Sequence, residues 1–237
     1  LDDLKTIKYE GHLHQIEADT TFFVGRLHKS VDVLYPVLQD ALLYRIGGDV
    51  KFKQGLQAWG TKQGIANVAD ADFHQAVAKQ IIYRLLVRIL FYFTLQRQWR
   101  NLPELSINGL SGQAASAHLK AIFARARDLD WHAVFEEGLS EEIELPDAAI
   151  HEINSLLHDL KRFSFSHMPH DVIGAVFEKL IPPPERHALG QYFTPENLVD
   201  LVLAFCVRQR DDKVLDPTCG TGTFLLRAYI KKMRHLG

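Results

Sequence analysis

The sequence has few cysteines, no excess of charge of either sign and no long apolar run. Only two of its 237 residues are cysteine, without a paired spacing, which excludes a disulfide-stapled fold and is typical of a reducing cytosol. The formal net charge of −2 excludes a basic surface over the whole chain, so any DNA contact must come from a local patch. The most apolar stretch, residues 81–95, contains two arginines and is too short to span a bilayer, and no signal peptide is visible. We therefore expect a cytoplasmic protein without membrane contact.

Helical patterns fill the chain up to residue 180. Hydrophobic residues make up 47% of the sequence, which is enough to bury a core. Apolar residues recur at helical spacing in the segments 31–46, 70–100, 147–161 and 171–180. The segment 114–127 is rich in alanine and is also predicted to be a helix. The acidic stretch 136–144 has the pattern of a solvated loop or helix edge. The sequence therefore predicts a mostly α-helical N-terminal domain over residues 1–180.

A proline run separates this domain from a different pattern. Three successive prolines cannot continue a helix, so residues 181–189 are predicted to be a stiff Pro-rich linker. Thr194 then has the features of a helix cap, followed by Pro195 in the first helical position and an acid in the first turn. Residues 213–216 have the pattern of a short buried strand, followed by a glycine-rich turn and a helix from Phe224 to Arg234. This order predicts the opening of a doubly wound α/β domain over residues 190–237.

The glycine-rich turn, residues 216–224, is the candidate ligand site. Such sheets bind ligands at the carboxyl ends of their strands, where this turn would lie. Gly220 and Gly222 let a ligand approach the backbone and permit a positive φ, and amides at the start of the next helix point into the same space. Asp216 would supply a negative charge near a cationic ligand. The spacing is neither that of a P-loop nor that of a dinucleotide fingerprint, so the motif by itself leaves other ligands open.

Two motifs here resemble those of DNA amino-methyltransferases. Asp216–Phe224, DPTCGTGTF, resembles the D-P-x-C-G-[ST]-G motif that cradles the methionine part of S-adenosylmethionine. Gly190–Pro195, GQYFTP, resembles the G-Q-[YF]-[YF]-T-P motif that precedes it in adenine methyltransferases of restriction–modification systems. On these motifs the chain is identified as a member of the N-6 adenine-specific DNA methyltransferase family of type I or fused type II systems. The implied fold is a mostly α N-terminal domain followed by the truncated start of a Rossmann-like α/β S-adenosylmethionine-dependent methyltransferase domain.

The resemblance also implies which residues contact the cofactor. Thr194 and the amides of the helix it begins would receive the methionine carboxylate, whereas Tyr192 and Phe193 would pack near the adenosine. Phe224 is expected to be a core contact of its helix. No metal site is expected, because the twelve histidines form no recognised zinc pattern. The implied S-adenosylmethionine-binding residues are Tyr192, Phe193, Thr194, Pro195, Asp216, Pro217, Thr218, Cys219, Gly220 and Gly222.

Two elements of the family pattern do not occur in the 237 residues. One is the acidic residue that holds the ribose hydroxyls, expected about 20 residues after the glycine motif. The other is the [DNS]-P-P-[YFW] motif, which binds the target amino group and stacks on the flipped base. We therefore expect the chain to be the N-terminal fragment of a longer enzyme, to hold no catalytic residue and to be inactive alone.

Two alternatives stay open beside transfer of a methyl group to adenine in DNA. The chain could belong to an S-adenosylmethionine-dependent methyltransferase with another acceptor, such as a cytosine amine, RNA or protein. Residues 1–180 could instead be a non-enzymatic helical interaction module for DNA or a specificity subunit. The partners implied are double-stranded DNA, bound by the full-length protein, and a specificity subunit or a second copy of the chain.

Overall fold

The computed structural model describes residues 16–17, 20–62, 71–99, 101–129, 131–164, 176, 178–188 and 193–235. The chain divides into two compact units, Leu1–His167 and Met168–Gly237. The strands within the described residues are two-residue segments, β1 (Ile16–Glu17) and β2 (Phe163–Ser164), which form a parallel pair in the first unit. Every other element described in the first unit is a helix, which confirms the predicted helical character of the N-terminal part. No helix within the described ranges has the length and apolar character needed to cross a membrane.

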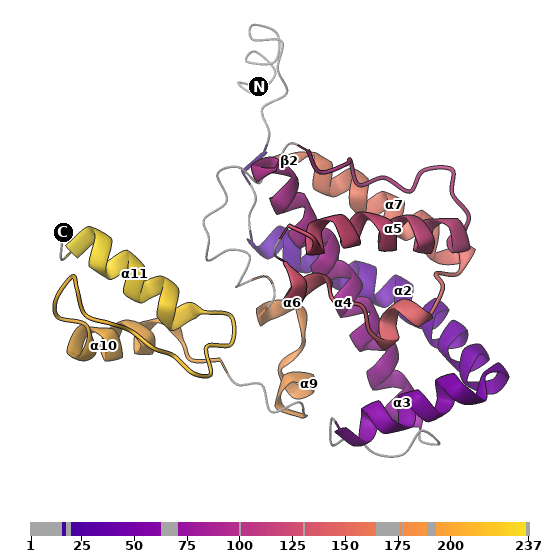
Figure 1. The fold of residues 1–237 in the computed structure, drawn as a ribbon, viewed down its shortest axis with the longest axis horizontal. Coiled ribbons are helices and arrows are strands. Elements are labelled where there is room, and N and C mark those ends of the chain that lie inside the picture. The colour runs from indigo at the N-terminus through magenta and orange to yellow at the C-terminus, as the bar shows by residue number, and fades with distance from the viewer. Residues whose placement is uncertain are drawn as a thin grey trace, which may run out of the picture. The chain divides into compact units, whose positions relative to one another are not determined.

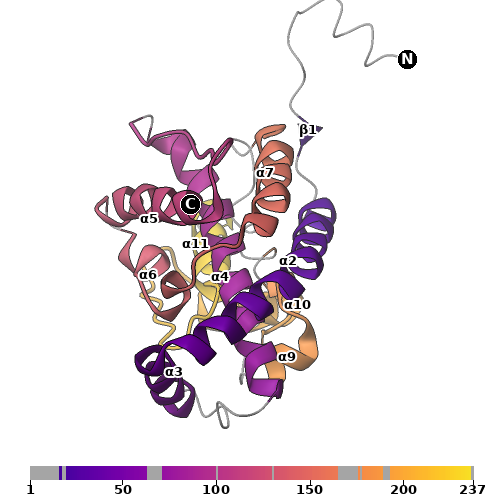
Figure 2. The ribbon, with the colours of Figure 1, turned by 90° about the vertical axis from the view of Figure 1, so that its right-hand side faces the viewer.

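Three long helices form the centre of the first unit. Helix α2 (Thr20–Gly48) packs against both α4 (Ala71–Gln98) and α7 (Asp147–Lys161), and Figure 2 shows α7 beside α2. Helix α3 (Val50–Lys62) follows α2, and α5 (Gly112–Arg127) packs against α4 and α7 (Figure 1). A short helix α6 (His132–Phe135) and a 3-10 helix η1 (Leu139–Glu142) lie between α5 and α7 in the chain.

The helical spacing of apolar residues explains this packing. Leu34, Leu38 and Leu42 of α2 are fully buried, at steps of four residues. The helices predicted at 31–46, 70–100, 114–127 and 147–161 are confirmed, although α2 begins well before residue 31. Pro36 lies inside α2 on its exposed side. The helix tolerates it there because the carbonyl of Asp32, which loses an N–H partner, belongs to an exposed residue and can be solvated.

The interface between α2 and α7 contains a buried ion-pair network centred on Arg26. The guanidinium donates to Glu152 Oε1 at 2.6 Å and to Asp159 Oδ2 at 2.6 Å, and its side chain is only 8% exposed. Ser30 is fully buried and also donates to Glu152 Oε1, at 2.7 Å. Burial by itself would lower the pKa of Arg26, but hydrogen bonds to the two carboxylates outweigh it and raise the pKa. Glu152 therefore depends on Arg26 for its compensating charge.

A second buried arginine changes the interpretation of the acidic segment 136–144. Arg88 of α4 is 3% exposed, donates to the carbonyl oxygen of Val134 at 2.9 Å and pairs with Glu141. Burial holds the pKa of Arg88 below its usual value. The segment is predicted to be a solvated loop or a helix edge. Glu141 lies in η1, but its side chain is only 15% exposed, so the prediction of a solvated position is wrong for this residue. The reason is a partner 53 positions away in the sequence, which local patterns cannot reveal.

The start of α5 packs directly on the chain before α7 at Gly112. A Cβ atom on Gly112 would lie 1.9 Å from the carbonyl oxygen of Leu145 and 2.9 Å from the amide nitrogen of Asp147. The amide of Gly112 also donates to Asp147 Oδ1 at 2.6 Å. Both neighbours are backbone atoms and cannot rotate away, so only glycine fits this contact.

We expect Gly112→Ala to destabilise the first unit by about 2–3 kcal/mol, because the added methyl group must separate α5 from the segment before α7. The measurement is the free energy of unfolding in urea. A matched control is Gly55→Ala in the middle of α3, where a Cβ meets nothing within 4 Å. Helix propensity makes that variant more stable by roughly 0.5–1 kcal/mol. Equal changes in the two variants would contradict this account of Gly112.

The second unit contains α9 (Pro183–Ala188), α10 (Glu196–Cys206) and α11 (Thr223–His235). Helix α9 begins within the proline run that is predicted to be a stiff linker. Proline is compatible with the first turn of a helix because its fixed φ suits it and its missing N–H would have no partner there. The helix predicted at 171–180 lies mostly outside the described residues, and Val176 and residues 178–180 within it are helical.

Helices α10 and α11 pack on a small apolar seam formed by Val199, Leu203, Val207 and Ala228, with Phe224 against it. The prediction of a strand at 213–216 is wrong. These residues pair with no other strand in the part of the chain that is described. A strand forms only with a hydrogen-bonded neighbour, and the described residues of this unit supply none. Leu215 of this segment is consequently 88% exposed.

Candidate functional site

The glycine-rich turn between the 213–216 segment and α11 has the backbone geometry expected of it. Gly220 has φ +54° and Gly222 has φ +82°, values that residues with a side chain rarely adopt. A Cβ on either glycine would meet nothing within 4 Å, so the backbone of the turn faces open space. The Gly222 amide donates to the Cys219 carbonyl at 2.7 Å, which closes the turn. The two glycines thus allow the positive φ angles of the turn and leave its backbone accessible to a ligand.

The ends of this turn are fixed by local hydrogen bonds. Asp216 is half-buried and accepts a hydrogen bond from the Thr218 amide at 3.1 Å, an arrangement in which aspartate stabilises a turn. The Leu226 amide donates to the Gly222 carbonyl at 2.9 Å and begins α11. The amides of the first turn of α11 precede this bond and have no partner within the helix, as at any helix start. They are the donors that an anionic or polar ligand would use.

Helices α10 and α11 run parallel. Arg227 of α11 pairs with Glu196 and Asp200 of α10, and Lys231, one turn further along α11, donates to the Leu203 carbonyl at 2.7 Å. The paired positions advance in the same direction on both helices, so the two N-termini lie at the same end (Figure 1). The segment before α10 and the glycine turn before α11 are therefore neighbours in this unit.

The start of α10 differs by one residue from the prediction. Pro195 is the cap, and its carbonyl accepts from the amides of Leu198 and Val199, each at 3.0 Å. Thr194 therefore precedes the cap and is exposed, and no side chain caps this helix. The predicted cap by Thr194 is wrong because proline can itself take the extended backbone of a cap position, at φ −56° and ψ 141°.

Most of the residues expected to contact the cofactor lie in the segment before α10 or in the glycine turn. Phe193 is half-buried, with the Arg186 guanidinium 5.3 Å from its ring centroid. Tyr192 lies outside the described residues. Phe224 packs against the apolar seam, as predicted for a core contact. The turn and the start of α10 present the following residues at one end of the helix pair: Thr194, Pro195, Asp216, Pro217, Thr218, Cys219, Gly220 and Gly222.

Sequence reasoning missed the residues that join the two helices. Arg227 Nε donates to Asp200 Oδ1 at 2.5 Å, and its Nη1 donates to Glu196 Oε2 at 2.7 Å. The hydrogen bond from Arg227 holds the pKa of Asp200 below its usual value. The two acids are four positions apart and so share one face of α10, which was the signal available in the sequence.

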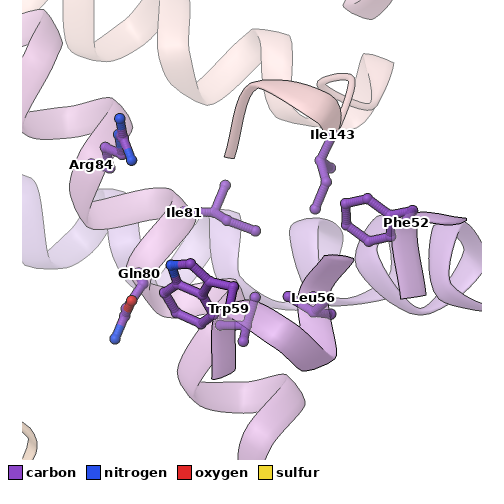
Figure 3. A pocket seen from close by; sticks show the side chains of 8 residues that line it. Phe52, Leu56, Trp59, Gln80, Ile81, Arg84 and Ile143 are labelled. Atoms are coloured by element: carbon purple, nitrogen blue, oxygen red, sulfur yellow. The ribbon is translucent and has the colours of Figure 1, made fainter. Parts of the chain in front are cut away.

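A separate hollow lies in the first unit, between α3, α4 and the segment after η1. Figure 3 shows Ile81 and Ile143 approaching it from facing elements, beside the Trp59 ring. Its volume is about 70 Å³, and its lining is Phe52, Leu56, Trp59, Val77, Gln80, Ile81, Arg84 and Ile143. An apolar cavity of roughly 150 Å³ is needed to hold a molecule as small as benzene. The hollow is therefore too small for a nucleotide-sized cofactor.

Residues 168–236 match the sequence model of the family described as N-6 DNA Methylase. Two similar proteins come from Methanocaldococcus jannaschii. The type I restriction enzyme MjaVII methylase subunit is 29% identical over 82 residues, which cover 34% of this chain and 14% of that protein. The type I restriction enzyme MjaVIII methylase subunit is 32% identical over 82 residues, covering 33% of this chain and 14% of that protein. No solved structure shows significant similarity.

The match places the glycine turn, the two parallel helices and the segment before α10 inside the family region. The aligned part of the chain spans about 14% of the length of either relative. Over residues 168–236, this chain is therefore similar to members of the N-6 DNA methylase family.

Proposed function

We propose that this chain is part of a DNA adenine-N6 methyltransferase of a restriction–modification system, and that its second unit binds S-adenosylmethionine. The observation that carries the proposal is the glycine turn, with positive φ at Gly220 and Gly222 at the start of α11. The family match and the two relatives named as methylase subunits support it. In this proposal residues 190–237 are the start of a Rossmann-like domain, residues 181–189 a linker and residues 1–180 a helical domain in the cytoplasm.

The residues at the turn fit such a cofactor. S-adenosylmethionine supplies an activated methyl group on a sulfonium and carries a carboxylate at its amino-acid end. The open space at Gly220 and Gly222 lets the ligand lie against backbone. The Asp216 carboxylate provides negative charge for the cationic part, and the first-turn amides of α10 receive the carboxylate. Phe193 offers an aromatic surface to the adenosine.

This chain holds no candidate for the methyl-transfer step itself. The only adjacent prolines, Pro182–Pro184, are followed by Glu185 and begin α9, so they do not form the [DNS]-P-P-[YFW] motif. We infer that the 237 residues bind the cofactor and transfer no methyl group alone. Partners of the whole protein are DNA and a specificity subunit or a second copy, in line with the naming of the relatives as subunits.

The test of the cofactor is equilibrium dialysis of the 237-residue chain with labelled S-adenosylmethionine. We expect saturable binding that S-adenosylhomocysteine displaces and that ATP and NAD leave unchanged, because the turn lacks the spacing of a phosphate-binding loop. No binding at millimolar ligand would refute the cofactor assignment.

The acceptor is tested on the natural protein that contains this sequence. DNA methylated by that protein is digested to nucleosides and analysed by mass spectrometry. N6-methyladenine is the expected product, whereas N4-methylcytosine or an unmodified digest would favour the alternative acceptors. A gel shift of the 237-residue chain on duplex DNA at low salt then tests direct DNA contact, since phosphate contacts weaken as salt rises.

A further inference from the structure

Arg227 joins the two segments that flank the proposed cofactor site. It lies on the first turns of α11, directly after the glycine turn, and it binds two carboxylates on the first turns of α10. Its planar guanidinium donates from Nε and Nη2 to the two oxygens of Asp200, and from Nη1 to Glu196. This fork geometry fixes orientation as well as distance, which a lysine ammonium cannot do.

The ion pairs of Arg227 with Glu196 and Asp200 are not needed to hold the two helices together. Val199, Leu203, Val207 and Ala228 already form a buried seam between them. Lys231 adds a bond to the Leu203 carbonyl further along the pair. The Arg227 side chain is 27% exposed, with Glu196 and Asp200 at 59% and 52%, and ion pairs at such sites contribute little to stability. Arg227 lies at the end of the helix pair where both helices begin, so its ion pairs act on that end and not on the stability of the whole pair.

We propose that Arg227 is a positioning residue, which sets the start of α10 at a fixed distance and angle from the glycine turn so that one S-adenosylmethionine molecule contacts both. This role rests on the proposed function. The amino-acid carboxylate of the ligand reaches the first-turn amides of α10, the remainder of the methionine part lies along the turn, and the adenosine packs near Phe193. A ligand that spans two segments gains affinity when their separation is fixed before binding. Arg227 does not itself touch the cofactor.

Two ligands separate positioning from general loosening of the fold. S-adenosylhomocysteine carries the amino-acid carboxylate and spans both segments. 5′-Methylthioadenosine lacks the amino-acid part and therefore does not use the first-turn amides of α10. We expect Arg227→Gln to weaken binding of S-adenosylhomocysteine roughly tenfold and binding of 5′-methylthioadenosine less than twofold, since only the ligand with the carboxylate needs the first turn of α10 to be aligned with the glycine turn. Arg227→Lys should recover part of the loss, because it keeps the charge but not the fork.

The matched control is Lys231→Gln, which removes a bond between the same helices one turn further along. We expect it to leave the ratio of the two affinities unchanged. Both affinities are measured by isothermal titration of the 237-residue chain, and amide hydrogen exchange of residues 218–224 is compared without ligand. Faster exchange there in Arg227→Gln, and not in Lys231→Gln, is the expected ligand-free result.

The outcomes are distinct. Wild-type chain that binds neither ligand would overturn the proposed function, and the positioning role with it. Wild-type chain that binds both, combined with an Arg227→Gln variant that loses both equally or neither, would overturn the positioning role and leave the proposed function standing. A selective loss of the spanning ligand supports both.

Discussion

Replacing Arg26 by methionine should destabilise the first unit by about 3–5 kcal/mol, because it leaves the buried Glu152 carboxylate without its compensating charge. Methionine has a similar length and fills the same space between α2 and α7, so little of this loss comes from a cavity. The Ser30 hydroxyl still donates to Glu152, but a neutral donor does not replace the charge. The free energy of unfolding is measured in urea by tryptophan fluorescence.

Two further variants make this result specific. Arg45→Met breaks a solvent-accessible pair between α2 and Asp49, the residue that separates α2 from α3, and should change stability by no more than about 0.5 kcal/mol. The double variant Arg26→Met/Glu152→Met removes both charges and should recover most of the loss, since a buried pair replaced by apolar groups is often neutral. A double variant as unstable as the single one would show that packing, and not the orphaned charge, dominates.

Replacing Gly222 by valine should reduce affinity for S-adenosylmethionine by roughly 100-fold, equivalent to about 2.8 kcal/mol. A β-branched residue at φ +82° is strained, at a cost of about 1–2 kcal/mol, so the turn would move from its present conformation. The new side chain would also occupy the open space above the turn, where nothing now lies within 4 Å. Equilibrium dialysis against the wild-type chain measures the loss.

Gly109 provides a control because its backbone also has a positive φ angle. It has φ +73°, its Cβ would also meet open space, and it lies in the first unit. Gly109→Val therefore carries comparable strain without touching the turn, and its affinity for the cofactor should equal that of wild type. If Gly222→Val also binds normally, the glycine turn is not the cofactor site.

Local patterns predicted the helices well because helix formation depends on neighbours in the sequence. Helix α7 begins and ends at the predicted residues, since its apolar positions repeat every three or four residues and Asp147 starts its first turn. The same reasoning identified the glycine turn, whose positive φ angles follow from residue type.

Contacts between distant residues explain what local patterns could not predict. The partners of Arg26 are 126 and 133 positions away, so no sequence window contains both ends of the network. The strand at 213–216 failed for a related reason, because a strand is defined by its neighbour and not by its own residues. Arg227 was overlooked because an exposed arginine on a helix is ordinary until its two acids are placed beside it in space.

The division into two units has a consequence for how the chain unfolds. The first unit buries long stretches of three helices, whereas the buried cluster between α10 and α11 has four residues. Cores so unequal lose their structure at different temperatures and denaturant concentrations, so unfolding of the chain is not a single all-or-none transition. All three tryptophans, Trp59, Trp99 and Trp131, lie in the first unit. Their fluorescence therefore follows the unfolding of that unit alone, whereas circular dichroism reports on both units, so unfolding of the second unit leaves the tryptophan signal unchanged.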